Sequence, residues 1–246
     1  MKPLCHSLCI IISLLSLHAQ TVSGDDILMR VDRAMNSKTR IITSTMVIHG
    51  RRDSRTVESV SHQRGTNDAF TEYLAPAREK GTKMLKLNDM LWTYSPSADR
   101  TILISQHMLR QSVMGSDLSY EDMMEDPHLP NLYSAVVSSE DTVKERTCWV
   151  LDLSAKKDDI AYYSRRVWID KVRYIILREH LFAKSGKLLK TVDITDVINV
   201  QNRWTIKSAL YKDVFKEGKG TEFYINSIRY DEVIPDHIFT KASLRR

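Results

Sequence analysis

Four carboxylates gather in one short stretch of the 246-residue sequence: Glu121, Asp122, Glu125 and Asp126. Carboxylate oxygens are the ligands that Ca²⁺ takes, so a cation site is the first chemistry to consider. The stretch lacks the Asp-x-Asp-x-Asp-Gly spacing of a calcium-binding loop. Acidic side chains are also favourable in the first turn of a helix. We therefore interpret the run as a solvated helix start and predict neither a metal nor a cofactor.

Catalytic centres leave recognisable spacings, and the sequence contains none of the common ones. It has no Gly-x-Ser-x-Gly elbow, no Gly-x-Gly-x-x-Gly fingerprint and no P-loop. Its eight histidines never take the His-x-x-x-His spacing of a zinc site. The sequence therefore predicts a protein that is not an enzyme. Catalysis is the least favoured of the alternative functions.

The charge of the chain is mild. The sequence holds 36 Lys+Arg against 31 Asp+Glu, a formal net charge of +5. The basic pairs Lys156-Lys157 and Arg165-Arg166 lack the interleaved aromatic residues of a nucleic-acid platform. We expect these pairs to serve solubility and predict no nucleic-acid partner.

The N-terminus has the layout of a cleavable secretory signal. A basic residue, Lys2, precedes an almost wholly apolar stretch over residues 4–17, and small residues follow. Cleavage after Ala19 and cleavage after Gly24 both fit this layout. The apolar stretch is shorter than the roughly 20 residues of a membrane-spanning helix, and an uncleaved anchor is the alternative. Export of this kind predicts an oxidising compartment outside the cytoplasm.

Removal of a signal over residues 1–24 leaves Cys148 as the sole cysteine. A lone cysteine cannot form an internal disulfide, and its place in an apolar strand predicts a buried side chain rather than a reactive thiol. Residues 25–246 must then be held together by their core. No Pro-, Gly- or Ser-rich linker divides them, which favours one domain.

The period of the hydrophobic pattern changes along the chain. Ile27, Leu28 and Val31 recur at helical spacing and predict a helix over residues 25–36. Alternating segments, typical of strands, fill residues 42–105 and 133–231. Residues between these blocks lack alternation and are rich in Met, Asp and Glu. Within them Ser119 stands three residues before an acid, which predicts a short capped helix.

Together these elements predict a mainly β (α+β) fold: about eleven antiparallel strands in sequence order, in a single sheet. So large a sheet twists and curls. The N-terminal helix and the short helical insert must cover one face of it. We expect an open half-barrel whose concave side is covered by both helices and encloses an apolar cavity.

Methionine is abundant, with ten residues in the chain, and six of them cluster between residues 84 and 124. Methionine is flexible and polarizable and is common where a surface accommodates variable apolar ligands. Simple filling of the core is the alternative for each single residue. The cluster coincides with the non-alternating segment, which favours an apolar ligand site there.

Four segments carry a resemblance to a known family. They are residues 73–82, residues 92–96 with their Trp-Thr-Tyr-Ser-Pro sequence, residues 115–122 with Gly-Ser-Asp-Leu-Ser-Tyr-Glu-Asp, and residues 163–170, which end in Trp-Ile-Asp. In this order and spacing the sequence resembles the LolA-like outer-membrane lipoprotein-sorting proteins, over nearly the whole mature chain.

The resemblance implies a periplasmic protein with an open β-barrel and a helical lid. It implies acyl chains of lipoproteins or lipids as cargo, carried towards the outer membrane. An inner-membrane exporter and an outer-membrane acceptor are the partners that such transfer requires. A lipid-binding accessory or sensor that works with an envelope lipid exporter or signalling system is the alternative function.

Apolar side chains of the predicted strands provide candidates for the cavity lining. They are Met46, Ile48, Leu85, Leu87, Trp92, Tyr94, Ile102, Ile104 and Trp168. The candidate lid residues are Met114, Leu118, Tyr120, Met123 and Met124. These face assignments depend on strand register, because a slip of one residue reverses them.

Overall fold

One antiparallel sheet organises residues 22–245, which the computed structural model describes. Most of the predicted signal segment, residues 1–21, lies outside the described residues. The strands are β1 (Thr39–His49), β2 (Ser54–Arg64), β3 (Asp68–Ala75), β4 (Lys83–Leu87), β5 (Met90–Ser95), β6 (Arg100–Leu103), β7 (Tyr133–Val143), β8 (Arg146–Ala155), β9 (Ser164–Asp170), β10 (Ile176–Phe182), β11 (Leu188–Val200), β12 (Arg203–Asp213) and β13 (Gly220–Tyr230).

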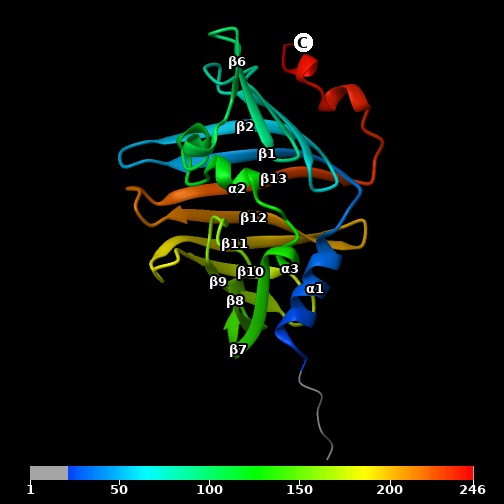
Figure 1. The fold of residues 1–246 in the computed structure, drawn as a ribbon, viewed down its shortest axis with the longest axis vertical. Helices are drawn as coiled ribbons and strands as arrows, with labels where there is room; N and C mark the ends of the chain where they lie inside the picture. The colour runs from blue at the N-terminus through cyan, green and yellow to red at the C-terminus, as the bar shows by residue number, and fades with distance from the viewer. Residues whose placement is uncertain (1–21, 246) are drawn as a thin grey trace, which may run out of the picture.

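The strand order is β6-β5-β4-β3-β2-β1-β13-β12-β11-β10-β9-β8-β7. Every neighbour pair but one is consecutive in sequence, and the exception is β1 with β13 in the middle of the sheet. The two edges are β6 and β7, although these strands follow each other along the chain. Figure 1 shows the connecting segment, residues 104–132, running along one face of the sheet from β6 to β7. We call this segment the insert.

The fold is mainly β, as predicted, with one large antiparallel sheet. The expected count of about eleven strands is wrong, since the sheet has thirteen. Several strands are joined by two residues alone, such as Lys144-Glu145 between β7 and β8 and Gln201-Asn202 between β11 and β12. All four residues have positive φ, as tight hairpin turns require. Connections this short leave room for thirteen strands within residues 39–230.

The helices are few and short. They are α1 (Gly24–Met35), α2 (Tyr120–Met124) and α3 (Leu129–Leu132), with 3₁₀ turns at Gln106–Met108, Val113–Gly115, Asp236–Phe239 and Lys241–Arg245. The N-cap of α1 is Ser23, whose side chain accepts a hydrogen bond from the backbone N–H of Asp26. The N-cap of α2 is Ser119, and a full capping box with Asp122 is present. Both helix starts confirm the sequence pattern.

The sheet buries apolar side chains on both faces. On one face the insert packs against Met46, Val57 and Met84, and we call this the insert face. On the opposite face of β3–β5 the C-terminal residues 234–244 pack against Phe70 and Trp92, and we call this the tail face. The strands between them are therefore buried from both sides.

The helix α1 packs on the half of the sheet that begins at β7. Ile27, Leu28 and Val31 form one cluster with Tyr133 of β7 and Val167 of β9. Residues 104–124 of the insert pack on the other half, whereas Leu129 and Leu132 at its end pack against the α1 cluster. Closure of both regions over one concave cavity stays a prediction.

Candidate functional site

The insert lays an apolar underside on the insert face of the sheet. Its candidate lid residues contact one buried cluster, which also contains three of the predicted lining residues, Met46, Ile48 and Ile104. The lid residues are partly buried rather than fully enclosed. The lid members of this cluster are Met114, Leu118, Tyr120, Met123 and Met124.

Five other predicted lining residues lie on the opposite side of the sheet. Leu85 and Trp92 are buried beneath the C-terminal residues, with Leu87 and Tyr94 packed beside them. Trp168 belongs to a further cluster with Cys148 and Leu177. Along β9 it alternates with Val167, which faces α1, so its ring points away from the insert.

Register explains this separation. Met84 of β4 pairs with Thr71, and its neighbour Leu85 pairs with Phe70 of the tail-face cluster. Adjacent residues of a strand point to opposite faces. The remaining candidate, Ile102, pairs with Thr93 at the edge of the sheet and is 45% exposed.

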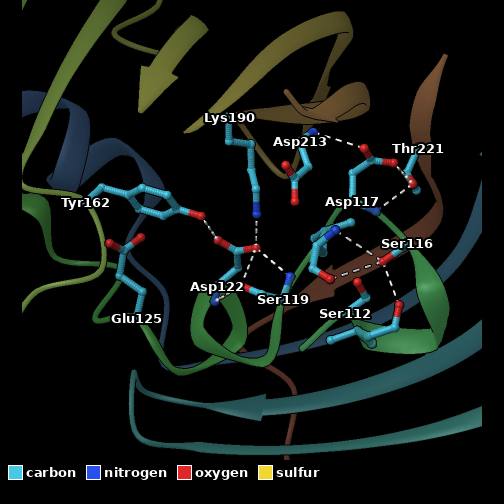
Figure 2. Close-up of polar contacts among 12 residues, drawn as sticks. Ser112, Ser116, Asp117, Ser119, Asp122, Glu125, Tyr162, Lys190, Asp213 and Thr221 are labelled. Atoms are coloured by element: carbon cyan, nitrogen blue, oxygen red, sulfur yellow. Dashed lines mark hydrogen bonds and ion pairs between the residues drawn. The ribbon is translucent and has the colours of Figure 1, made fainter. Parts of the chain in front are cut away.

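A buried carboxylate fixes α2 to the far half of the sheet (Figure 2). Asp122 accepts a hydrogen bond from Nζ of Lys190 on β11 and one of 2.5 Å from the hydroxyl of Tyr162. It also accepts from the backbone N–H of its own N-cap, Ser119, at 2.7 Å. Burial alone would raise the pKa of Asp122, but Lys190 and these hydrogen bonds outweigh it, so the pKa lies below its ordinary value.

A second carboxylate of the insert pairs with a buried arginine. The guanidinium of Arg165, on β9, bonds to Glu125 of the insert and lies 3.3 Å from Glu179 of β10. It also stacks over the rings of Tyr133 and Tyr162, at 4.9 and 5.3 Å from their centroids. Although burial favours the neutral form, the two glutamates hold the pKa of Arg165 above its usual range. Burial raises the pKa of Glu179.

The first part of the insert is held by further polar contacts, seen on the right of Figure 2. Asp117 accepts a 2.7 Å hydrogen bond from the hydroxyl of Thr221 and a 2.9 Å bond from the backbone N–H of Asp213. Nζ of Lys216 donates to the side chain of Ser112 and to the backbone oxygen of Ser116. We call these contacts and the two carboxylate clusters together the polar clasp.

The interpretation of the acidic run as a solvated helix start is therefore wrong for Asp122 and Glu125. Both side chains are mostly buried, at 16% and 17% exposure, and both are ion-paired. Their partners Lys190 and Arg165 stand 68 and 40 residues away in the sequence. The capping pattern indicated the position of Asp122 at a helix start. No local sequence pattern predicts an ion pair with a residue so far away in the sequence.

A pocket of about 350 Å³ lies between the insert and strands β1–β4. The insert contributes Leu118 and Met123 to its lining, and the sheet contributes Met46, Tyr73 and Phe223. Hydroxyl and cationic side chains of the sheet complete the lining. The volume is at the lower end of pockets that bind small molecules, which span about 300–1,000 Å³.

The described part of the chain offers little else for chemistry. Within residues 22–245 no three His, Cys, Asp or Glu side chains gather where they could hold a metal ion. In the same residues, no helix is both long and apolar enough to cross a membrane. Cys148 is fully buried, and burial raises the pKa of its thiol, so its predicted place in the core is confirmed.

A family model described as an uncharacterized protein matches residues 65–246. Among curated proteins, none matches the chain. Three of the solved structures that match it show the likeness in fold.

A DUF1329 family protein from Desulfovibrio piger is 23% identical with a TM-score of 0.83, and the match covers 90% of this chain and 97% of that one. A structure described as an outer membrane lipoprotein-sorting protein domain, from Vibrio parahaemolyticus, is 21% identical with a TM-score of 0.81, covering 91% and 98%. A LolA superfamily protein from Nitrosomonas europaea is 18% identical with a TM-score of 0.74, covering 91% and 100%. The chain therefore belongs to the family that this model describes, and it shares the fold of these three structures.

Proposed function

We propose that this protein is a periplasmic carrier that binds acyl chains of lipoproteins or lipids between the insert and the sheet, for transfer towards the outer membrane. One observation carries the proposal: the insert covers the sheet with a methionine-rich apolar underside but is fixed by discrete polar contacts. Such a cover can leave the sheet when those contacts break. The proposed role is carriage and not catalysis.

The side chains under the insert suit a variable apolar ligand. Met84 is fully buried there, and Met114, Met123 and Met124 are partly buried around it. Unbranched methionine side chains change rotamer at low cost and fill irregular gaps. They can pack against each other when the site is empty and against an acyl chain when it is filled.

The free energy gained by burying an acyl chain can offset the cost of lifting the insert from the sheet. Burying ten methylene groups of an acyl chain contributes about 8 kcal/mol, at about 0.8 kcal/mol each. Lifting the insert exposes both ions of a pair such as Asp122–Lys190 to water, so it costs less than the about 3–5 kcal/mol of removing one partner alone. A single long chain can therefore offset the opening of one clasp contact and leave a net gain. Release then needs an acceptor that stabilises the open form or binds the lipid more tightly.

Export to the periplasm is supported by the signal-like N-terminus, residues 1–24. Two of the solved structures that share the fold are described as lipoprotein-sorting or LolA superfamily proteins. An exporter in the inner membrane and an acceptor in the outer membrane are the partners that this role requires.

Native mass spectrometry of protein purified from its own envelope tests the proposal directly. We expect bound species with the masses of lipids or acylated peptides. Delipidated protein should bind a fluorescent fatty acid, and Met123→Lys should weaken that binding because it places a charge in the pocket lining. Met29→Lys, at a 39% exposed position on α1, is the matched control and should bind normally. Absence of lipid from both experiments would overturn the proposal.

A further inference from the structure

The pocket under the insert changes character along β1. Met46 pairs with Val57 and Phe223, all beneath the insert, whereas Arg40 pairs with Gln63 towards the start of the strand. Arg40, Gln63, Met46 and Phe223 all line the pocket. Arg40 and Met46 are six residue steps apart along the strand, about 20 Å at 3.3 Å per residue. One end of the site is therefore apolar and the other is polar.

Two cations at the polar end have no carboxylate partner. Arg40 and Lys86 line the pocket, and none of the ion pairs found within residues 22–245 includes either of them. The carboxylates that line the same pocket are already neutralised. Asp122 pairs with Lys190, Glu125 with Arg165 and Asp68 with Arg64.

These two cations are also poorly solvated. Burial lowers the pKa of Arg40; Tyr230 offsets part of this effect, and a second cation, Arg203, adds to it. Burial likewise lowers the pKa of Lys86, and the surrounding carboxylates, Asp126 first among them, offset only part of this effect. Desolvated positive charge is costly unless an anion compensates it. The pocket therefore has an unmet preference for negative charge.

Hydroxyl groups between the row of the cations and Met46 supply further donors. Ser44 and Ser59 lie 3.0 Å apart, and Ser61 and Thr71 lie 2.8 Å apart, each as a hydrogen-bonded pair. One hydroxyl in each pair donates to the other, so the proton of the second remains available for a ligand. Together with Arg40 and Lys86 they form a donor-rich surface on β1–β4.

We propose that the polar end of this pocket binds an anionic head group, a phosphate or a carboxylate, of a lipid whose acyl chain lies at the Met46 end. This inference rests on the proposed function and narrows its cargo to anionic acyl lipids. Charge-assisted hydrogen bonds to such a group are the strong ones. The neutral head group of an uncharged lipid would leave both cations uncompensated.

Head-group binding is linked to the insert through Lys86. Its Nζ donates a 3.2 Å hydrogen bond to the backbone oxygen of Met124 in the insert. An ammonium group has three donors, so Lys86 can hold this oxygen and a bound anion at the same time. A bound head group would therefore lie directly beside the insert.

Titration calorimetry below the critical micelle concentration tests the inference with three lipids that share one oleoyl chain. Lysophosphatidic acid supplies a phosphate, oleate a carboxylate and monooleoylglycerol a neutral head. We expect the Arg40→Gln/Lys86→Gln variant to lose about tenfold or more in affinity for the two anions. Its affinity for monooleoylglycerol should stay within about threefold of the unmodified chain.

Control variants separate local contacts from net charge and folding. Arg229→Gln/Lys219→Gln removes the same charge at exposed positions that do not line the pocket, and it should bind all three lipids normally. Far-UV circular dichroism and thermal melting establish that each variant is folded. Inorganic phosphate alone forms a fourth arm, and we expect binding at least about tenfold weaker than that of lysophosphatidic acid.

The outcomes are distinguishable. Equal affinity for neutral and anionic lipids, unchanged in the Arg40/Lys86 variant, would overturn the head-group inference and leave the carrier function standing. Binding of inorganic phosphate as tight as that of lysophosphatidic acid would show a soluble anion site and overturn it as well. Binding of none of the lipids by the unmodified chain would overturn the proposed function itself.

Discussion

The ammonium group of Lys190 on β11 donates to the carboxylate of Asp122 on α2, and both side chains are largely enclosed, at 6% and 16% exposure. The insert packs over β1, β2 and β4, and this pair joins it to β11 in the other half of the sheet. A buried pair of this kind adds little net stability against an apolar replacement, but it is costly to break on one side only. It therefore acts as a fixed point for the insert.

Replacement of Asp122 by Asn should loosen the insert. The change leaves Lys190 as an uncompensated buried cation, so we expect a loss of about 3–5 kcal/mol in the free energy of unfolding. Hydrogen exchange should accelerate in residues 104–132 before it does in β8–β12. Asp152→Asn is the matched control, because the Asp152–Arg166 pair is 43% and 49% exposed and contributes about 0–1 kcal/mol. Equal effects of the two substitutions would contradict the fixed-point role.

Acid should release the insert over the pH range in which Asp122 becomes protonated. The folded-state pKa of Asp122 lies below its ordinary 3.8, so the stability that the pair contributes is complete above that value and is lost as the pH falls through the lowered pKa. Glu179 acts in the opposite direction and at higher pH, since burial raises its pKa. We expect proteolytic cleavage by an acid protease within the insert below pH 3.8. The same pH dependence in Asp122→Asn would argue against this cause.

Shortening Met84 tests the packing beneath the insert. Its side chain is 2% exposed, so Met84→Ala should cost about 2–5 kcal/mol through lost burial and a cavity. Met90→Ala, at a 48% exposed position, should change the free energy of unfolding by about 0.5 kcal/mol or less. Urea unfolding measures both. A similar small change for the two variants would mean that the insert does not seal this face.

The folded start of α1 bears on signal cleavage. Ser23 caps the helix, and a Cβ built on Gly24 would lie 2.4 Å from the backbone oxygen of Ala135, so both residues are part of the packed structure. We therefore expect cleavage after Ala19, which the mass of the mature protein will show. A chain that begins at residue 20 should also be about 1 kcal/mol more stable than one that begins at residue 25, because only the former keeps the cap. A mature mass that starts at residue 25 would refute this expectation.

Local patterns predicted the elements of this fold well. Ser119 and Asp122 located α2 through a capping box, and the spacing of Ile27 and Val31 located α1. Asn88-Asp89, two residue types that favour turns, separates β4 from β5. In each case the residues that cause the structure are neighbours in the sequence.

Face assignment could not be read in the same way. In β4 four successive residues, Lys83 to Lys86, are all buried, because the insert covers one face and the C-terminal residues cover the other. A strand buried on both faces shows no alternation between apolar and polar positions. Met84 and Leu85 were therefore equally good candidates, and only the register of β3 with β4 separates them.

The polar clasp was beyond sequence patterns for a different reason. Lys190 lies in an alternating strand, where a lysine is usually solvated. Its burial arises because the insert returns over β11, 68 residues away in the sequence. Such pairs become visible only when the topology is known.

The path of the insert has a geometric consequence. The insert connects the two edge strands, β6 and β7, of an open sheet. Its length therefore sets an upper limit on the distance between the two edges. Thirteen strands flatten or bend only if the distance between the edge strands changes, and the connecting segment limits that distance. Breaking a contact in the middle of the insert therefore permits not only local opening but a change of curvature shared by every strand pair.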